Sequence, residues 1–173
     1  MKLIVGVAED WGIGYENELL HWVPEDIAYF KEKTMGKVII MGYLTLLSLP
    51  GEKPLPGRVN VVVCDDENIS VPGTLMSRTL KDLHGLTKFR DADDLFVIGG
   101  ASIYEQLLPY CTQAYITKFK SAEKKPADKY FPNLDELDNW TMIDAAEPKE
   151  YEGTSFTFTI YENSDVKKLT DLP

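Results

Sequence analysis

The feature that most constrains the fold is an alternation between short apolar runs rich in β-branched residues and segments with helical periodicity. Several runs are almost continuously apolar, as central strands covered on both faces are. Strands are predicted at residues 3–8, 38–41, 59–63, 95–98, 114–119, 141–144 and 154–161. Helices are predicted at residues 25–34, 44–49, 80–86 and 101–108. This order predicts an α/β domain with parallel strand pairs, and the last two strands, with no helix between them, predict a C-terminal antiparallel hairpin.

The chain is expected to form a single domain followed by a short tail. Its 173 residues are enough for one hydrophobic core. We expect residues 1–163 to form the domain and residues 164–173, which are mostly polar, to form a frayed C-terminal tail.

Composition excludes several classes of partner. The formal net charge is −10, whereas a nucleic-acid-binding surface would be basic, so no nucleic-acid partner is expected. No apolar run approaches membrane-spanning length, and the first residues lack the pattern of a secretory signal. The two cysteines, Cys64 and Cys111, suggest a reducing compartment rather than a disulfide framework. We therefore expect a cytoplasmic protein that binds a small molecule, without a membrane partner or a metal site.

Asp26 is an acidic residue at a position where a predicted helix should bury apolar side chains. Pro24 suits the first turn of that helix. Residues three and four apart share a helix face, so Asp26 should lie beside Phe30, with Ile27 at the edge of the same apolar stripe. Burial would raise the pKa of the carboxyl group and make it a proton relay near neutral pH. The alternative is an exposed first-turn aspartate that complements the helix dipole.

Two glycine-bearing segments suggest where a ligand approaches the backbone. Residues 9–22 form a long loop with Gly12 and Gly14, and such a loop is either a functional lid or a plain connection. Gly99 and Gly100 stand between a buried strand and a helix whose N–H groups can meet a phosphate, although a plain turn is the alternative. The diglycine is not the fingerprint of an ordinary Rossmann fold.

Two further residues are candidates for contacts with anionic ligands. Arg58 stands at a turn that leads into a strand, where its guanidinium group can clamp a carboxylate with two hydrogen bonds. The alternative is a solvated surface arginine. Gly42 ends a strand and Thr45 follows in the first turn of a helix, which offers a second seat for a pyrophosphate. Many such turns carry glycine and threonine only for capping.

Taken together and in this order, the motifs resemble those of dihydrofolate reductases over residues 2–162. The shared residues are Gly12, Ile13, Gly14, Asn17, Pro24, Glu25, Asp26, Phe30, Lys31, Thr34, Met41, Gly42, Thr45, Pro54, Leu55, Pro56, Gly57, Arg58, Asn60, Val97, Ile98, Gly99, Gly100, Tyr104, Tyr115, Ile116, Thr117, Asp128, Phe131 and Pro132. The resemblance implies a mixed, mostly parallel sheet of about eight strands flanked by about four helices, with the C-terminal hairpin antiparallel.

The resemblance also implies residue roles in a hydride transfer from a reduced nicotinamide to a pterin carbon, with the neighbouring nitrogen protonated. Asp26 and Thr117 are the expected catalytic residues. The expected substrate-binding residues are Val5, Ile27, Phe30, Leu49, Arg58, Ile98 and Tyr104, with Arg58 on the glutamate α-carboxylate of folate. The expected cofactor-binding residues are Gly6, Ile13, Gly14, Asn17, Leu19, Gly42, Thr45, Val63, Cys64, Asp65, Gly99, Gly100, Ala101, Ser102 and Ile103. Tyr104 is also expected near the cofactor, and Asp128 is expected to steady the lid.

The first departure from the family pattern lies in the lid. Where the family usually has Pro-Trp, the chain has Leu20 and His21, with Trp22 one position later. The usual tryptophan helps to order water over the pterin. His21 is expected to be an exposed loop histidine rather than a base.

The second departure concerns the phosphates of the cofactor. The family usually has basic residues after Met-Gly and Ser, Thr or Arg after the next strand, whereas this chain has Tyr43, Leu44, Cys64 and Asp65. The Asp65 carboxylate would repel the 2′-phosphate of NADPH but can accept a hydrogen bond from the bare ribose hydroxyl of NADH. Arg78 is a cation that can compensate in part. NADPH is the expected cofactor, with a weakened preference over NADH.

The predicted function is that of a dihydrofolate reductase, in which NADPH reduces 7,8-dihydrofolate to 5,6,7,8-tetrahydrofolate. One alternative is a related pterin or pyrimidine reductase of the same fold, against which Asp26, Phe30 and Arg58 argue. The other alternative is a folate-binding module with a decayed cofactor site, which Tyr43 and Asp65 motivate. The protein is expected to be a monomer.

Overall fold

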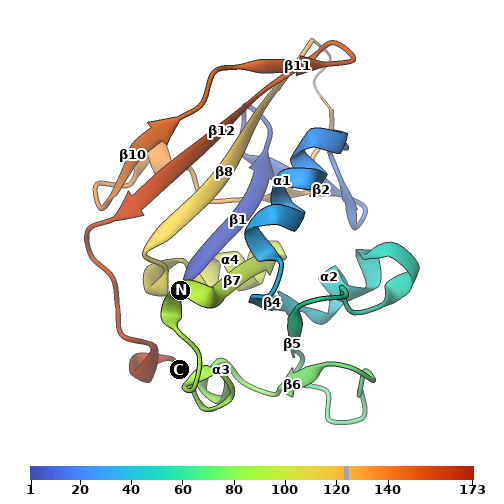
Figure 1. The fold of residues 1–173 in the computed structure, drawn as a ribbon, viewed down its shortest axis with the longest axis vertical. Coiled ribbons are helices and arrows are strands. Elements are labelled where there is room, and N and C mark those ends of the chain that lie inside the picture. Colours follow the sequence, from blue (N-terminus) through green and yellow to red (C-terminus); the bar gives the residue numbers. More distant parts are fainter. Residues whose placement is uncertain (123–124) are drawn as a thin grey trace.

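The fold is built on one mixed sheet. The computed structural model describes residues 1–122 and 125–173. Among these residues, strands join in the order β10-β12-β8-β1-β7-β4-β5-β6, and β11 also pairs with β12 (Figure 1). The pairs from β8 to β6 are parallel, whereas every pair made by β12 is antiparallel. The strands are β1 (Lys2–Val7), β4 (Val38–Gly42), β5 (Val59–Val63), β6 (Leu75–Ser77), β7 (Leu95–Gly99), β8 (Gln113–Ser121), β10 (Trp140–Ala145), β11 (Lys149–Tyr151) and β12 (Thr154–Asn163).

Four α-helices flank this sheet among the described residues: α1 (Pro24–Thr34), α2 (Tyr43–Ser48), α3 (Leu80–Thr87) and α4 (Ala101–Leu107). Every helix and strand predicted from the sequence is present within two residues of its predicted bounds. The mixed sheet, the flanking helices and the antiparallel C-terminal hairpin are confirmed.

The helices cover opposite faces of the sheet, which explains the continuous apolar runs. In β1, Leu3 belongs to the cluster that contains Leu83 of α3 and Leu107 of α4. The next residue, Ile4, belongs to the cluster that contains Leu46 of α2 and partly buried residues of α1. Side chains alternate between the faces of a strand, so a strand covered on both sides must be apolar at every position. Figure 1 shows α1 in front of the sheet and α4 behind it.

The long loop at residues 9–22 is more ordered than a plain connection. It contains β2 (Gly12–Tyr15) and β3 (Glu18–Leu19), which pair with each other, and β2 also pairs with β9 (Lys129–Tyr130) in a separate small sheet. Glu16 and Asn17 connect the two strands with φ angles of 49° and 66°. Two successive residues with positive φ are typical of a tight hairpin turn, and the sequence pattern did not predict this hairpin.

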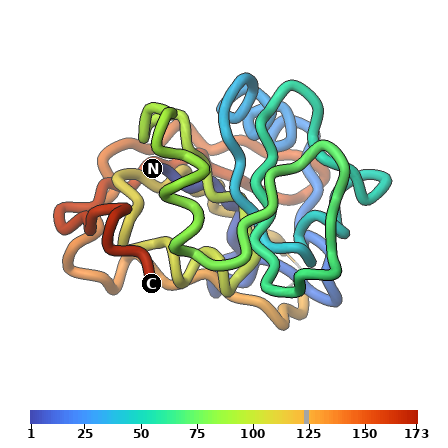
Figure 2. Tube along the Cα trace, turned by 90° about the horizontal axis from the view of Figure 1, so that it is seen from below, coloured from blue at the N-terminus to red at the C-terminus, as the bar shows by residue number. Residues whose placement is uncertain are grey.

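The tail at residues 164–173 is packed, so the expectation of a frayed tail is wrong. Leu172 is buried in the cluster that contains Leu3, Leu83 and Leu107, which we call the main core, and Leu169 packs against it. Lys167 N donates to Pro109 O at 2.9 Å, and Tyr110 Oη donates to Asp171 O at 3.1 Å. The short 3₁₀ helix η5 (Leu169–Asp171) explains the difference, because residues three apart eclipse in such a turn and place both leucines on one side. Figures 1 and 2 show the C-terminus beside α3.

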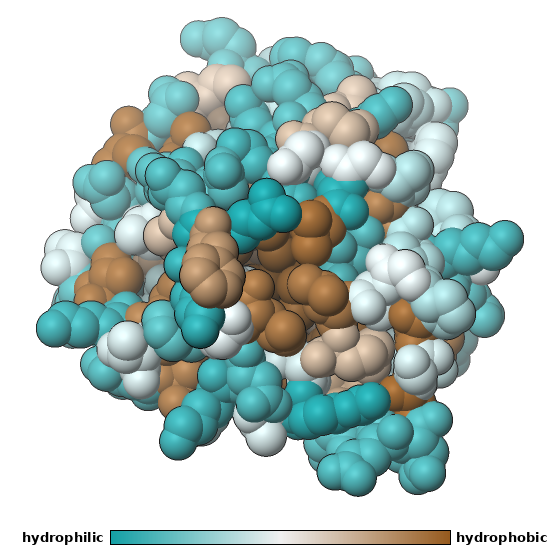
Figure 3. Space-filling model, turned by 60° about the horizontal axis from the view of Figure 1, so that its bottom comes forward, coloured by the Kyte–Doolittle hydropathy of each residue, from teal (hydrophilic) through white to brown (hydrophobic). Residues whose placement is uncertain are grey.

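The surface is mixed rather than uniformly polar. Figure 3 shows a face on which apolar residues gather in a central hollow and hydrophilic residues surround them. In the described part of the chain, no helix combines the length and the apolar character that crossing a membrane requires.

Candidate active site

The structure brings Asp26 and Thr117 together from elements 91 positions apart in the sequence. Thr117 Oγ1, on β8, donates to Asp26 Oδ1, on α1, at 2.6 Å. Thr117 is buried and Asp26 is partly buried. Val23 anchors the start of α1, because it is buried against Phe119 and Phe156. The helix is therefore fixed with its first turn against β8, and the carboxyl group points to the sheet rather than to solvent.

The environment of Asp26 favours the neutral carboxyl group. Burial raises its pKa above the ordinary aspartate value, and the hydrogen bond from Thr117 opposes this effect only in part. A carboxyl group whose pKa is raised by desolvation retains a proton at a higher pH than a solvated one does. The pair can thus hold a proton next to an apolar surface, which is what a general acid requires.

An apolar wall lies on the same side of the sheet. Phe30, Leu49 and Ile98 pack partly buried against the cluster that contains Ile4. Ile27, one position after Asp26 on α1, is also partly buried. Val5 does not join this group, because it points to the opposite cluster as alternation along β1 requires. Ile4 is therefore the β1 side chain on this wall. The sequence signal that could have identified Ile4 is the alternation of side chains between the two covered faces of the sheet.

Tyr104 lies beneath the wall rather than on it. Its ring is buried in the opposite cluster, and its hydroxyl group donates to Ile4 O at 2.7 Å. The ring also limits the space around Gly99, where an added Cβ atom would lie 3.2 Å from Tyr104 Cε2. Tyr104 thus connects α4 to β1 and supports the diglycine.

Arg58 is held beside the apolar wall with part of its guanidinium group free. Its Nε donates to Thr34 Oγ1 at 2.9 Å, and its Nη1 donates to Pro56 O at 2.8 Å. The guanidinium carbon lies 5.8 Å from the centre of the Phe30 ring. Within the described residues Nη2 has no hydrogen-bond partner, so it can meet a carboxylate without breaking either bond.

Two glycines bring the first turns of α2 and α4 close to each other. A Cβ atom on Gly100, which precedes α4, would lie 3.2 Å from Thr45 Oγ1 of α2. A Cβ atom on Gly42, which precedes α2, would lie 3.2 Å from Ile103 Cγ1 of α4. Larger residues at either position would push the turns apart. Gly99 adopts a φ of 123°, which favours glycine. Ala101 and Ser102 complete the first turn of α4.

The carboxyl end of β5 borders the region formed by the first turns of α2 and α4. The charged groups at this strand end are arranged unfavourably for a phosphate. Val63 and Cys64 are partly buried, whereas Asp65 is exposed. Arg78 Nη1 donates to Cys64 O at 3.2 Å and to Asp66 O at 2.6 Å. Its Nη2 donates to Ile69 O at 2.8 Å. The arginine is thus near Asp65 but is occupied by backbone carbonyl groups of the loop that follows β5.

The lid makes contacts with two neighbouring segments. Asn17 Nδ2, at its tip, donates to Leu44 O of α2 at 3.2 Å. Asp128 N donates to Gly14 O at 3.0 Å, and Glu16 N donates to Asp128 Oδ2 at 3.1 Å. Ile13 packs against the main core, whereas Leu19 is 68% exposed. Leu19 thus presents an apolar side chain to solvent on β3.

His21 is buried, so the expectation of an exposed loop histidine is wrong. Its ring stacks on Phe119 with centroids 4.7 Å apart and an interplanar angle of 21°. Phe119 in turn lies over Gly6, where an added Cβ atom would be 2.7 Å from Phe119 Cε2. Gly6 pairs with Thr117 in the sheet, so this stack borders the Asp26 pair. The sequence could not predict the stack, because it depends on a phenylalanine about 100 residues away.

The burial of His21 predicts a pH dependence of stability. Burial, together with the charge of Lys125, lowers the pKa of His21 below its ordinary value. The unfolded chain therefore binds a proton more readily, and stability is lost as pH falls below about 6.5. In His21→Phe this loss should be smaller, since the ring can still stack on Phe119 without titrating. Melting temperatures of both proteins between about pH 7 and pH 5 test this, and parallel curves would contradict it.

Comparison with known proteins places the chain in a family. The family model for dihydrofolate reductase matches residues 1–163. The chain belongs to the dihydrofolate reductase family. A dihydrofolate reductase from Bacillus subtilis is 35% identical over an alignment of 163 residues that covers 90% of this chain and 90% of the relative. One from Neisseria meningitidis serogroup A is 35% identical over 162 residues, covering 93% of this chain and 96% of the relative. A solved dihydrofolate reductase from Enterococcus faecalis, complexed with NADP(H), has a TM-score of 0.81 at 25% identity and covers 95% and 96% of the two chains.

These findings confirm the reductase activity inferred from the resemblance. The family reduces 7,8-dihydrofolate to 5,6,7,8-tetrahydrofolate with NADPH, and this chain is an oxidoreductase of that family. The first turns of α2 and α4 approach each other so closely that a Cβ atom on Gly42 or Gly100 would crowd the other helix. The described residues of α2 and α4 carry no Lys or Arg. A phosphate held between these two helices would therefore meet uncharged donors, namely backbone N–H groups and hydroxyl groups such as those of Thr45 and Ser102.

Proposed function

We propose that Asp26 is the residue through which this reductase protonates its substrate. When bound, NADPH supplies the hydride and is left as NADP⁺. Hydride addition to a pterin carbon, with a proton on the neighbouring nitrogen, saturates one carbon–nitrogen double bond. The partly buried carboxyl group of Asp26, held by Thr117 beside the apolar wall, is the observation that carries this proposal.

The rest of the site binds and orients the substrate in this proposal. Phe30, Leu49, Ile27 and Ile98 contact the pterin and benzoyl groups and exclude water from them. Arg58 binds the α-carboxylate of the glutamate tail with the part of its guanidinium group that is free of protein partners. Water exclusion by the apolar wall keeps the pKa of Asp26 raised, because desolvation is the larger cause of its shift.

The cofactor in this proposal lies across the carboxyl ends of β4, β5 and β7, as ligands of open α/β sheets do. The cofactor's phosphates are bordered by Gly42, Thr45, Gly99, Gly100 and Ala101–Ile103. Its ribose is bordered by Val63, Cys64 and Asp65. The lid closes over the cofactor with Ile13, Gly14, Asn17 and Leu19. Gly6 of β1 lies below the cofactor. We also propose a monomeric protein in the cytoplasm, which the acidic composition and the two free cysteines support.

The test of the function is the loss of absorbance as NADPH is oxidised, with dihydrofolate present or absent. Dihydrofolate-dependent oxidation by the purified chain is the expected result. If dihydrofolate binds without any oxidation of NADPH, the chain is a folate-binding module and the proposed function is wrong. If only pterins or pyrimidines without the glutamate tail are reduced, the substrate assignment is wrong.

Asp65→Arg is expected to raise the affinity for NADPH and barely change that for NADH. In the native protein a carboxylate stands where the 2′-phosphate is expected, and Arg78 is occupied by three carbonyl groups. A charge-assisted hydrogen bond contributes about 1.5–3 kcal/mol, which is about tenfold or more in affinity. Dissociation constants of both cofactors, measured by fluorescence titration, check this. Asp65→Asn is the matched control, because it removes the negative charge that repels the 2′-phosphate without adding a positively charged hydrogen-bond donor.

A strong native preference for NADPH would contradict this assignment. If the unmodified protein prefers NADPH over NADH by about a hundredfold, a gap of about 2.7 kcal/mol, another cation must hold the 2′-phosphate. Arg78 would then have to leave its carbonyl partners, and Arg78→Leu would abolish the preference.

A further inference from the structure

Two aromatic rings form a second link between α1 and the sheet, next to the Asp26–Thr117 pair. Tyr29 of α1 stacks on Phe158 of β12, with ring centroids 4.1 Å apart and an interplanar angle of 23°. Both side chains are partly buried. Phe158 also packs edge-on against the buried Phe156, with centroids 5.6 Å apart. We call the stack of Tyr29 on Phe158 the aromatic link.

The aromatic link and the Asp26–Thr117 hydrogen bond join neighbouring positions on the same two surfaces. Tyr29 is three positions after Asp26, so the two side chains lie on the same face of α1. Phe158 is the cross-strand partner of Thr117 in the antiparallel pair of β8 and β12. Directly opposite residues in such a pair lie on the same face of the sheet, with Cβ atoms about 4.5–5.5 Å apart. The stack and the hydrogen bond are therefore adjacent contacts between α1 and the sheet.

The aromatic link covers a side of Asp26 that the apolar wall does not. The residues three and four positions after Asp26 flank it on the helix surface. Phe30, at the fourth position, lies beside Arg58, with 5.8 Å between its ring centre and the guanidinium carbon. Tyr29, at the third position, is stacked on β12 instead. A substrate in contact with Phe30 would leave the Tyr29 side of the carboxyl group uncovered, so the aromatic link excludes water on that side.

Charged groups border the aromatic link, but they are too exposed to replace it. The Lys149 ammonium group pairs with Glu25 and lies 5.7 Å from the centre of the Phe158 ring. The Lys33 ammonium group lies 5.1 Å from the centre of the Tyr29 ring. The side chains of Lys149 and Glu25 are 46% and 51% exposed, and ion pairs in such positions contribute little to stability.

The ring of Tyr29, rather than its hydroxyl group, makes the contact. Among the described residues this hydroxyl group makes no hydrogen bond. Burial raises the pKa of Tyr29 to about 12, so the phenol stays neutral over the range in which a carboxyl group titrates. Smaller contributions to this raised pKa come from Tyr115 of β8, Glu32 and Asp26 of α1, and Asp144 of β10.

We propose that Tyr29 and Phe158 are positioning residues for the proton transfer, because their stack fixes the rotation of α1 and keeps water from the Asp26–Thr117 pair. This inference rests on the proposed role of Asp26, since the stack acts through that carboxyl group. Desolvation is the largest cause of the raised pKa of Asp26. Admission of water at the stack should therefore lower this pKa, whereas loss of the hydrogen bond from Thr117 should raise it.

Tyr29→Leu and Phe158→Leu test the aromatic link, because leucine keeps an apolar side chain but removes the ring. The first measurement is the ¹³C chemical shift of the Asp26 carboxyl carbon, followed by NMR against pH in protein without ligands. The signal is assigned by its absence from Asp26→Asn, and no turnover is needed. In both leucine variants the carboxyl group should titrate at lower pH than in the wild type.

The second measurement is the pH dependence of hydride transfer in single turnovers. In both leucine variants the midpoint of the fall in rate should move to lower pH, opposite to the direction expected for Thr117→Val. The rate at neutral pH should fall by about three- to tenfold, because a smaller fraction of the carboxyl group is protonated. Tyr29→Phe keeps the ring and should restore wild-type behaviour in both measurements.

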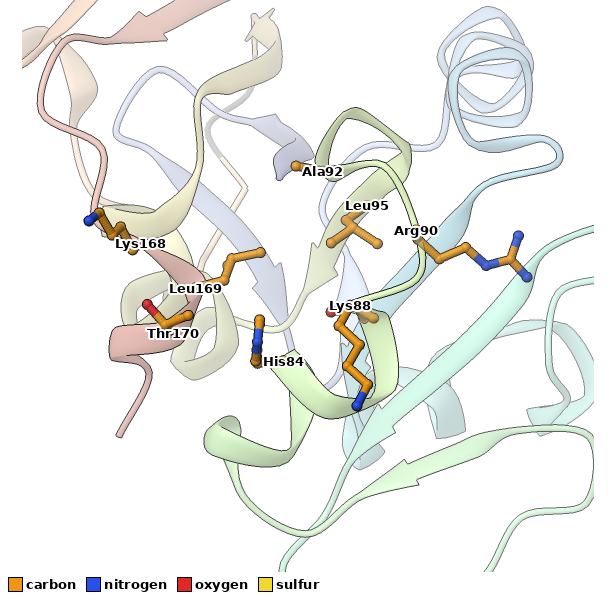
Figure 4. Close-up of a pocket in the computed structure, with 9 residues that line it drawn as sticks. His84, Lys88, Arg90, Ala92, Leu95, Lys168, Leu169 and Thr170 are labelled. Carbon is orange, nitrogen blue, oxygen red and sulfur yellow. The ribbon is translucent and has the colours of Figure 1, made fainter.

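Leu169→Ala is the matched control for a general loss of apolar packing. Leu169 comes from the C-terminal tail and packs against the main core, on the face of the sheet opposite α1. It lines a cavity of about 410 Å³ between α3 and the tail, where Figure 4 shows it beside Thr170. This variant should lower the melting temperature but leave the titration of Asp26 in place.

Three results would overturn the proposal. The first is an unchanged titration of Asp26 in both leucine variants. The second is an equal shift in Leu169→Ala, which would show that any loss of packing affects the carboxyl group. The third is a shift in Tyr29→Phe as large as that in Tyr29→Leu, which would assign the effect to the hydroxyl group. A titration that moves while the rate profile stays in place would support the aromatic link but contradict the proposed role of Asp26.

Discussion

Asp26→Asn is expected to lower kcat at neutral pH by about 10²–10⁴-fold, the contribution of a positioned proton donor. Asparagine keeps the shape and accepts the hydrogen bond from Thr117 Oγ1, but it cannot release a proton. Steady-state oxidation of NADPH with dihydrofolate measures the effect. In acid the loss should be smaller, because solvent supplies protons more readily. Wild-type-like turnover of the variant at neutral pH would remove Asp26 from its assigned role.

The same variant should be at least as stable as the wild type at neutral pH, which separates loss of catalysis from loss of fold. Because burial raises the pKa of Asp26 in the folded state, its ionisation costs stability as pH rises above the ordinary value of 3.8. Asparagine avoids this cost. The melting temperature of Asp26→Asn should exceed that of the wild type near neutral pH, and the difference should vanish in acid. A lower melting temperature at neutral pH would show that the carboxylate is a structural partner.

Arg58→Leu is expected to raise KM for dihydrofolate by about ten- to a hundredfold and to change kcat less. The variant removes a charge-assisted contact of about 1.5–3 kcal/mol that is made away from the reacting atoms. A contact of equal strength in the ground state and the transition state affects KM rather than kcat. Steady-state kinetics with dihydrofolate give both constants.

Two controls distinguish substrate binding by Arg58 from a structural role. A pteridine without the glutamate tail should be nearly indifferent to Arg58→Leu. Arg58→Lys keeps the charge but loses the fork, so its KM should lie between those of the wild type and Arg58→Leu. If both substrates suffer equally, the bonds from Arg58 to Thr34 and Pro56 hold the backbone and the carboxylate assignment is wrong.

The sequence was a good guide to the elements of the main sheet because local patterns determine them. Continuous apolar runs such as that of β4 indicate two covered faces, and Pro24 marks the start of α1 within one residue. The hairpin of β2 and β3 was not predicted, because its signal is the backbone conformation of Glu16 and Asn17 rather than a hydrophobic period. The packed tail was missed because Leu169 and Leu172 are only two apolar residues in a polar segment.

Contacts between distant residues explain what the sequence did not predict about the site. Asp26 on an apolar helix face could be proposed from spacing, and Thr117 from the resemblance, but their 2.6 Å hydrogen bond depends on how α1 docks. His21 was expected at the surface because its partner, Phe119, lies far along the chain. The side chain of Val5 lies on the opposite face of the sheet from Phe30 and Leu49, because a one-residue shift along a strand exchanges the two faces, and its contact with substrate stays a prediction.

The most direct test is the pH dependence of the hydride-transfer step, measured in single turnovers for the wild type and for Thr117→Val. The wild-type rate should fall as pH rises through the raised pKa of Asp26, because the protonated carboxyl group is the active form. The hydrogen bond from Thr117 lowers this pKa, so its loss in the variant should move the midpoint of the fall to higher pH. A midpoint that stays in place or moves to lower pH would contradict the assignment of the proton to the Asp26–Thr117 pair.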